Sequence, residues 1–196
     1  MIDLVVLALA YLIGSVPAGY LLGSRAGIDI RKAGSGNIGA TNVARVLGKR
    51  QGILTLLADV GKGYLAVWIA AHLQAAASIT ALAGIAAFLG HLYPIFLKFR
   101  GGKGVSTALG ALLALAPLAV PILIAIFGVT IAISRKTSLA SMVAAAAAPV
   151  TLWVLSYPLA VVASGAFFAL MIIFRHRANI QRLRTGTEPS FGTSSR

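Results

Sequence analysis

The chain has 196 residues, 59% of them hydrophobic, and a mean hydropathy of +0.92. These values are typical of a polytopic membrane protein and exclude an ordinary soluble domain. The sequence contains no cysteine, which excludes disulfides, thiolate nucleophiles and cysteine metal sites. Its net charge of +13 comes from 17 Lys and Arg residues against four acids. Four carboxylates are hardly enough to build a metal cage or a catalytic carboxylate pair.

Long apolar segments recur along the chain and predict membrane-spanning helices. The first covers residues 2–23, tolerates Pro17 within it, and lacks the basic start of a signal peptide. Four more are predicted at 53–73, 76–97, 138–155 and 158–174. The second of the five carries Asp59 and Lys62 three residues apart, which predicts an ion pair within the membrane that braces the helix bundle.

The apolar stretch 105–134 fits neither one ordinary span nor two. Thirty residues of helix would measure about 45 Å, against a hydrocarbon core of about 30 Å. Pro117 and Pro121 lie near its middle, where they interrupt a helix. This stretch is therefore predicted to form two short, tilted helices with a turn near residues 116–121.

Sixteen of the 17 basic residues fall in four clusters, at 25–50, 98–103, 135–136 and 175–196. The positive-inside rule places all four clusters in the cytoplasm, so the stretch 105–134 must cross the membrane twice. The prediction is an all-α integral membrane protein of seven transmembrane helices, with the N-terminus outside and the C-terminus cytoplasmic. It forms a single domain over 1–196, with uncharged outer joins near Gln74 and Ser156 and an unstructured end at 192–196.

The cytoplasmic clusters include two Gly-rich segments, both of a kind that binds phosphate. Residues 32–48 combine glycines with polar side chains and lead into a short helix, on which Thr41 and Arg45 share a face before Gly48 ends it. A Gly turn that feeds a helix N-terminus presents free N–H groups to an anion. Residues 99–107 depart from a Walker A loop, yet the consecutive glycine amides beside Lys103 predict an anion-binding nest. Each segment, taken alone, also fits a plain membrane-edge loop.

The third cluster is the tail at 175–188, predicted to prolong the last helix into the cytoplasm. His176 and Asn179 lie three residues apart and share a helix face. An Arg-rich helix end is also an ordinary anchor for lipid head groups. The His-x-x-Asn pair and the ending Gly186-Thr-Glu188 are features that an anchor does not explain.

Taken together, these segments resemble a known family, the bacterial acyl-phosphate:glycerol-3-phosphate acyltransferases (the PlsY family). The resemblance covers nearly the whole chain and rests on long, mixed motifs, which are residues 13–17, 34–42, 59–63, 90–91, 99–107, 138–141, 177–183 and 186–188. It implies a multi-pass enzyme of the bacterial inner membrane with its active site at the cytoplasmic face, in loops 31–50 and 98–107 and tail 175–189. The implied reaction moves an acyl group from acyl phosphate to the sn-1 hydroxyl of glycerol 3-phosphate, giving lysophosphatidic acid and phosphate.

The resemblance also implies roles for individual residues. The glycerol phosphate and the reacting centre are assigned to Ser35, Arg45, Lys103, His176 and Asn179. The donor phosphate is assigned to Thr41, Asn42 and the turn Gly101, Gly102 and Gly104, together with Ser141. Glu188 is expected to orient a basic side chain. Further substrate-binding residues are Gly36, Asn37, Ser106, Thr107 and Arg177. The implied enzyme is a monomer that contacts membrane lipid, needs no metal or other cofactor, binds no nucleic acid and forms no acyl-enzyme.

Two other functions compete with this one at the level of sequence. A carrier or channel for phosphate-bearing anions would place its polar, broken-helix features near the middle of the bilayer. Here the Gly-rich motifs fall at the predicted cytoplasmic edge, which favours an enzyme. A metal-dependent lipid-phosphate enzyme is disfavoured because the chain has three scattered histidines and few carboxylates.

Overall fold

The computed structural model describes residues 2–73 and 75–190, so the predicted join at Gln74 and the predicted end at 192–196 lie outside the described residues. Within those ranges the chain forms helices and loops and no strand. Its contacts divide it into two compact units, one up to Ala114 and one from Leu115 onward, which are described separately below as the first and second units.

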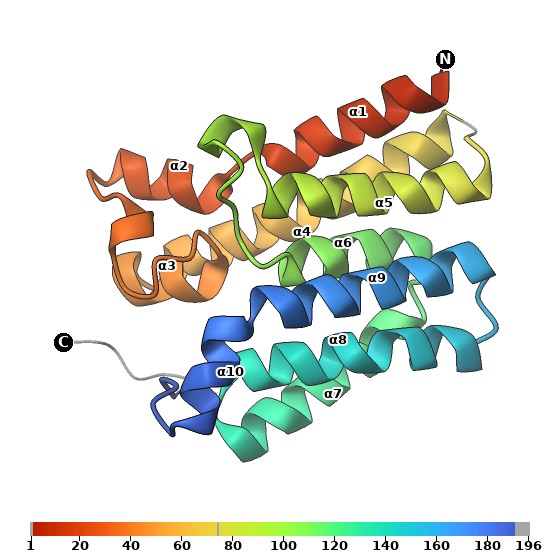
Figure 1. The fold of residues 1–196 in the computed structure, drawn as a ribbon. Coiled ribbons are helices and arrows are strands. Elements are labelled where there is room, and N and C mark those ends of the chain that lie inside the picture. The colour runs from red at the N-terminus through yellow and green to blue at the C-terminus, as the bar shows by residue number, and fades with distance from the viewer. Residues whose placement is uncertain (1, 74, 191–196) are drawn as a thin grey trace. The chain divides into compact units, whose positions relative to one another are not determined.

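The first unit contains most of the helices (Figure 1). They are α1 (Ile2–Ser15), α2 (Ala18–Arg25), α3 (Ala40–Leu47), α4 (Lys49–His72), α5 (Ala77–Leu92) and α6 (Val105–Leu115), with short 3-10 turns η1 (Ile30–Lys32) and η2 (Ile95–Leu97). Helices α1 and α5 touch along their backbones. A Cβ atom on Gly14 would lie 2.0 Å from the carbonyl oxygen of Ala87, and one on Gly90 would lie 2.2 Å from that of Tyr11. Small residues here allow the close helix approach common in membrane proteins.

The first predicted span is interrupted at Val16 and Pro17, which separate α1 from α2. Proline has no N–H to continue the helical hydrogen-bond ladder. The carbonyl of Val16 instead accepts a bond of 3.0 Å from Lys62 Nζ on α4. The predicted span is confirmed as one stretch, Ile2–Arg25, although its helix is broken at Val16 and Pro17, where the buried Lys62 binds the carbonyl of Val16.

The second unit contains α7 (Ala119–Ser134), α8 (Thr137–Val154), α9 (Leu159–Arg175) and α10 (Arg177–Arg184). Helix α8 packs against both α7 and α9. The backbone N–H of Leu118, just before α7, donates to the hydroxyl of Tyr157, between α8 and α9, at 3.3 Å. These two turns therefore lie at the same end of the unit.

The helix positions predicted from the apolar segments are confirmed to within a few residues. Four stretches are long and apolar enough to cross a membrane, namely Ile2–Arg25, Lys49–His72, Ala77–Leu97 and Thr137–Val154, and α9 joined to α10 makes a fifth if a bent pair counts as one. The predicted division of 105–134 is also confirmed, since α6 and α7 are separate shorter helices. Pro121 lies in the first turn of α7, where proline is tolerated, and not in the turn itself. The number of spans and their orientation remain predictions.

Candidate functional site

The loop that precedes α3 is organised by the side chain of Asn42. This residue is 1% exposed, and its Nδ2 lies 3.0 Å from the carbonyl of Ala33 and 2.9 Å from that of Asn37. A third carbonyl, that of Ile30, lies 3.3 Å away, and Asn42 Oδ1 accepts the backbone N–H of Ser35 at 2.8 Å. The sequence assigned Asn42 to a substrate phosphate. In the structure its amide holds the loop in shape, and the assignment to a phosphate stays a prediction.

The short helix predicted in this segment is confirmed. Helix α3 begins at Ala40 and ends before Gly48, whose φ of +95° suits glycine. Thr41 and Arg45 lie one turn apart on it, with Thr41 exposed and Arg45 half-buried in the last turn. Ser35 is exposed in the loop, with its backbone tied to Asn42. The loop thus presents a hydroxyl, and α3 a threonine and a guanidinium, from a fixed backbone.

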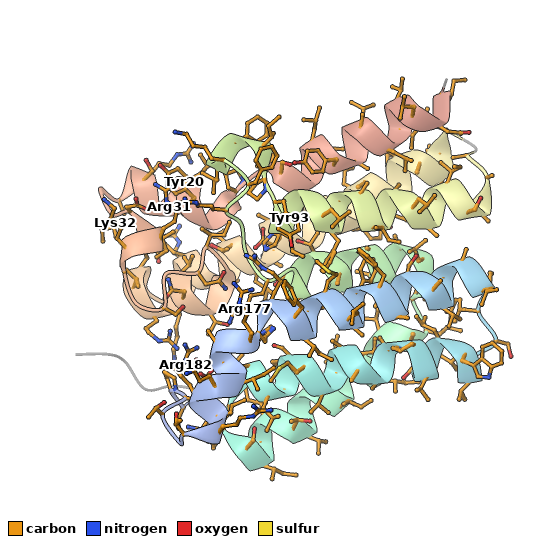
Figure 2. The ribbon with its side chains drawn as sticks, in the orientation of Figure 1. Tyr20, Arg31, Lys32, Tyr93, Arg177 and Arg182 are labelled. Atoms are coloured by element: carbon orange, nitrogen blue, oxygen red, sulfur yellow. The ribbon has the colours of Figure 1, made fainter. Side chains whose placement is uncertain are left out.

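The rest of this loop is also held in place. Gly36 approaches the chain so closely that a Cβ there would lie 2.9 Å from the carbonyl oxygen of Arg31. Arg31 pairs with Asp29 at 2.8 Å and stacks over the ring of Tyr20 at 4.6 Å (Figure 2). The hydrogen bond from Arg31 lowers the pKa of Asp29 to about 2. Asp29 is therefore an anion at neutral pH and a poor base.

The turn that leads into the second Gly-rich segment packs against the first segment within the first unit. Leu97, in η2, is buried in one apolar cluster with Ile30, Ile38 and Val43 of the first segment. The shared cluster places η2, the turn that leads into the second loop, against the segment that contains Ser35. This contact could not be predicted from sequence patterns, since the residues that meet are some sixty positions apart.

The second Gly-rich segment does not form the predicted anion-binding nest at its first two glycines. The N–H of Gly101 donates to the carbonyl of Leu92, and that of Gly102 to the carbonyl of His91, both at 3.1 Å. The last carbonyls of a helix lack intrahelical hydrogen-bond partners. At the end of α5 the N–H groups of this turn are those partners. These two amides are engaged by the protein, and a role of this turn at a phosphate stays a prediction.

The remaining predicted residues of this segment lie at the start of α6. Gly104 has a φ of +87°, and a Cβ there would lie 2.2 Å from the ring of Phe88, so only glycine fits. Lys103 and Ser106 are half-buried. Thr107 is fully buried, its hydroxyl has no hydrogen-bond partner among the described residues, and its backbone packs against Gly63 of α4.

In the second unit, the tail does not simply prolong the last helix. Helices α9 and α10 meet at an angle of 58°, with His176 between them, so the prediction of one continuous helix is wrong. His176 is buried, and its Nδ1 lies 2.8 Å from the carbonyl of Ile172. Because a carbonyl can only accept, the proton resides on Nδ1 and Nε2 is the basic nitrogen.

Glu188 lies at the centre of a hydrogen-bonded cluster that ties the tail to α8 and α10. Its carboxylate, 7% exposed, accepts bonds from Ser138 Oγ and Asn179 Nδ2 at 2.6 Å and from Arg182 Nε at 2.7 Å. Lys136 Nζ donates to the carbonyl of Glu188 and to Ser190 Oγ. Burial disfavours the ionised carboxylate, but these donors outweigh it and lower the pKa of Glu188. Sequence reasoning missed the parts of Lys136 and Ser138, which lie some fifty residues away.

Two further predicted residues of this unit have local partners. Ser141 is buried and donates to the carbonyl of Thr137 in its own helix at 2.9 Å. Arg177 is exposed, with its guanidinium 5.3 Å from the ring centre of Phe174 (Figure 2). Among the described residues, no group of three or more His, Cys, Asp or Glu side chains could hold a metal ion.

Comparison with known proteins gives one consistent answer. Residues 4–186 match the family model described as glycerol-3-phosphate acyltransferase. Proteins of that name from Geobacter metallireducens and Geotalea daltonii are 53% and 49% identical, covering 97% and 96% of this chain and 98% and 97% of their own.

Two solved structures are also similar, both crystal structures of PlsY (YgiH), an integral membrane glycerol 3-phosphate acyltransferase. The glycerol 3-phosphate form has a TM-score of 0.94 at 40% identity, and the lysophosphatidic acid form a TM-score of 0.92 at 39% identity. Each covers 98% of this chain and 97% of its own. The chain is therefore an all-helical integral membrane enzyme, an acyltransferase, and it belongs to the glycerol-3-phosphate acyltransferase family.

Proposed function

We propose that this protein transfers a fatty acyl group from acyl phosphate to the sn-1 hydroxyl of glycerol 3-phosphate, giving lysophosphatidic acid and phosphate. The observation that carries the proposal is the likeness to a solved acyltransferase whose two forms are named for glycerol 3-phosphate and lysophosphatidic acid. The protein acts as a monomer in the bacterial inner membrane, with the site at the cytoplasmic face. The acyl phosphate donor rests on the sequence motifs.

The transfer takes place in one step without an acyl-enzyme. The hydroxyl oxygen of glycerol 3-phosphate attacks the carbonyl carbon of acyl phosphate, the bond from that carbon to the phosphate oxygen breaks, and phosphate leaves. Acyl phosphate is already an activated mixed anhydride, so alignment and charge stabilisation can supply much of the rate. The hydroxyl proton passes to Nε2 of His176 or to a substrate phosphate. The tautomer set by Ile172 supports the first route.

The basic side chains bind the phosphates and the neutral ones orient the hydroxyl. Arg45 and Lys103 contact the phosphate of glycerol 3-phosphate, with Ser35 and Thr41 hydrogen-bonded to substrate oxygens. Asn179, oriented by Glu188, binds a hydroxyl of the acceptor. Asn42 and the turn at Gly101 and Gly102 act indirectly, by fixing the backbone that carries these groups.

A covalent route is disfavoured by the state of the acids. A serine nucleophile needs a base and usually an acid that orients it. Three of the four acids are already paired, Asp29 with Arg31, Asp59 with Lys62 and Glu188 with Arg182. The fourth, Asp3, lies in the first turn of α1.

Direct transfer predicts that the purified protein, given radiolabelled acyl phosphate without acceptor, keeps no label after denaturation. With glycerol 3-phosphate added, the label should appear in lysophosphatidic acid with release of one phosphate. Acyl-CoA and acyl carrier protein thioesters serve as donor controls and should not support transfer. Stoichiometric label on Ser35 or Ser106, discharged by glycerol 3-phosphate at the turnover rate, would overturn the one-step mechanism. Transfer from a thioester but not from acyl phosphate would show that acyl phosphate is not the acyl donor.

The topology predicts that the turn before α7 faces the outside. In this cysteine-free chain, Leu118→Cys is a suitable probe because Leu118 is 72% exposed, whereas the neighbouring Ala119 is fully buried. A membrane-impermeant thiol reagent should label Leu118→Cys from the outer side. A cysteine at Thr185, exposed on the tail, should react only from the cytoplasmic side. Labelling of both from the same side would show that the seven-span arrangement is wrong.

A further inference from the structure

Three buried polar side chains form a cluster in the first unit that the proposed reaction does not use. Asp59, Lys62 and His91 are 2%, 8% and 4% exposed. Lys62 Nζ lies 2.8 Å from Asp59 Oδ1, which confirms the ion pair predicted from their spacing. His91 Nδ1 lies 3.5 Å from the same oxygen, close enough for an electrostatic contact. Ionisable groups inside a membrane are costly, so a retained cluster calls for a role.

The cluster lies directly beneath the turn that carries Lys103. The carbonyl of His91 accepts the N–H of Gly102, and the carbonyl of Leu92 accepts the N–H of Gly101. The imidazole is also in contact with this turn, since a Cβ on Gly102 would lie 2.2 Å from His91 Nε2. His91 therefore supports the turn through both its backbone and its ring, and the residue that follows the turn is Lys103.

A second anchor holds the same helix end from the other side. The hydroxyl of Tyr11, on α1, donates to the carbonyl of Tyr93 at 2.6 Å (Figure 2 labels Tyr93). The carbonyls of His91, Leu92 and Tyr93 thus all have partners, two from the Gly turn and one from α1. The end of α5 is fixed by α1 and by α4, through Asp59.

The backbone leading into the turn is strained and depends on these anchors. Lys98 and Phe99 have φ values of 52° and 61°, two consecutive left-handed residues with large side chains. Such strain persists only where the surroundings enforce it. Without the anchor at His91, the segment can relax and Lys103 would move with it.

We infer that Asp59 is a positioning residue for the acyltransferase site. It holds the ring of His91, His91 fixes the Gly101–Gly102 turn, and the turn places Lys103 at the phosphate of glycerol 3-phosphate. Lys62 balances the charge of Asp59 and donates to the carbonyl of Val16. The inference rests on the proposed role of Lys103. It differs from a simple bracing pair, which would affect the stability of the bundle and leave substrate affinity unchanged.

The test separates folding from affinity by measuring the KM for each substrate and the midpoint of thermal unfolding in detergent. His91→Leu should raise the KM for glycerol 3-phosphate at least ten-fold and change the KM for the acyl donor less than three-fold. His91→Asn should recover most of that affinity, because its amide nitrogen can take the place of Nδ1 beside Asp59. The matched control is His72→Leu at the end of α4, where His72 stacks on Trp68, and its KM values should match wild type.

A double variant keeps the test decisive if His91→Leu does not fold. Asp59→Leu combined with Lys62→Met removes the ion pair but leaves the His91 side chain intact. Replacing a buried pair by apolar residues often preserves or increases stability. The folded double variant should nevertheless show a raised KM for glycerol 3-phosphate. A normal KM for glycerol 3-phosphate in this variant, with or without a change in unfolding midpoint, would show that the cluster only stabilises the helix bundle and would overturn the inference.

Lys103→Ala, measured in parallel, distinguishes the inference from the function on which it rests. If Lys103→Ala leaves the KM for glycerol 3-phosphate unchanged, the role of Lys103 fails, and the positioning role fails with it. If Lys103→Ala raises that KM while the double variant and His91→Leu do not, the role of Lys103 stands and only the positioning role is wrong.

Discussion

Arg45→Ala should lower kcat/KM for glycerol 3-phosphate by about 10–150-fold, because hydrogen bonds to a charged group contribute about 1.5–3 kcal/mol. Arg45 lies in the last turn of α3, on a helix whose preceding loop is fixed by Asn42, so its guanidinium has a defined starting position. Arg45→Lys keeps the charge but loses the planar fork that matches two phosphate oxygens. It should therefore recover only part of the activity.

The matched control is Arg184→Ala. Arg184 is a basic residue that is also predicted to lie on the cytoplasmic side of the membrane, and it is exposed at the end of α10. Its loss should change kcat/KM by less than about two-fold, as exposed charges contribute little. Both rates are measured with purified protein at two ionic strengths. Equal losses for the two variants, erased together by salt, would mean that the basic residues act only through the surface potential.

Glu188→Ala should destabilise the second unit by about 1–3 kcal/mol, the usual cost of leaving buried hydrogen-bonding groups unsatisfied. The substitution leaves the hydroxyl of Ser138 and the amide of Asn179 without their carboxylate acceptor. It also releases Arg182, so the tail loses its bond to α10. The midpoint of thermal unfolding should fall, and limited proteolysis should cut the tail after Arg182 or Arg184. Activity should fall as well, since Asn179 loses its orientation.

The effect of Glu188 has a defined pH dependence. Its folded pKa lies below the ordinary value, so its stabilisation is fully present above the unfolded pKa and is lost as pH falls through the folded pKa. Wild type should therefore lose stability below about pH 4.3, the ordinary pKa of glutamate. Glu188→Gln should be less stable at neutral pH, and its stability should fall less steeply as the pH is lowered (a flatter acid limb). Asp29→Asn, which breaks an exposed pair, serves as the control and should leave the unfolding midpoint nearly unchanged. Parallel acid limbs in wild type and Glu188→Gln would contradict this account.

The helices could be predicted from the sequence because the apolar segments are long and the breaks are marked by proline, glycine or charge. The division of 105–134 followed from its length, its two prolines and the basic clusters on either side, and the end of α3 followed from Gly48. The pair of Asp59 and Lys62 followed from their helical spacing. In each case the signal is local, within one or two turns of helix.

The sequence was least informative where a polar group had two possible partners. The amides of Gly101 and Gly102 could serve an anion or the open end of α5, and only the fold decides in favour of α5. Asn42 could face a ligand or the loop behind it. Glu188 finds Ser138 across fifty residues, a contact that no local pattern encodes. Long-range pairing of this kind is fixed by packing and not by spacing.

Because of the hydrogen bonds around Asn42, the conformational entropy of the first loop is lost during folding and not during substrate binding. A loop that became ordered only around its substrate would lose conformational entropy at each binding event, about 1–2 kcal/mol for every residue fixed. Here a single buried amide orders residues 30–42 during folding, before any ligand arrives. The substrate then binds to a loop that is already ordered, and its affinity is not reduced by folding of the loop. The encounter resembles docking onto a rigid surface, so its heat-capacity change reflects the substrate's own desolvation and not coupled folding.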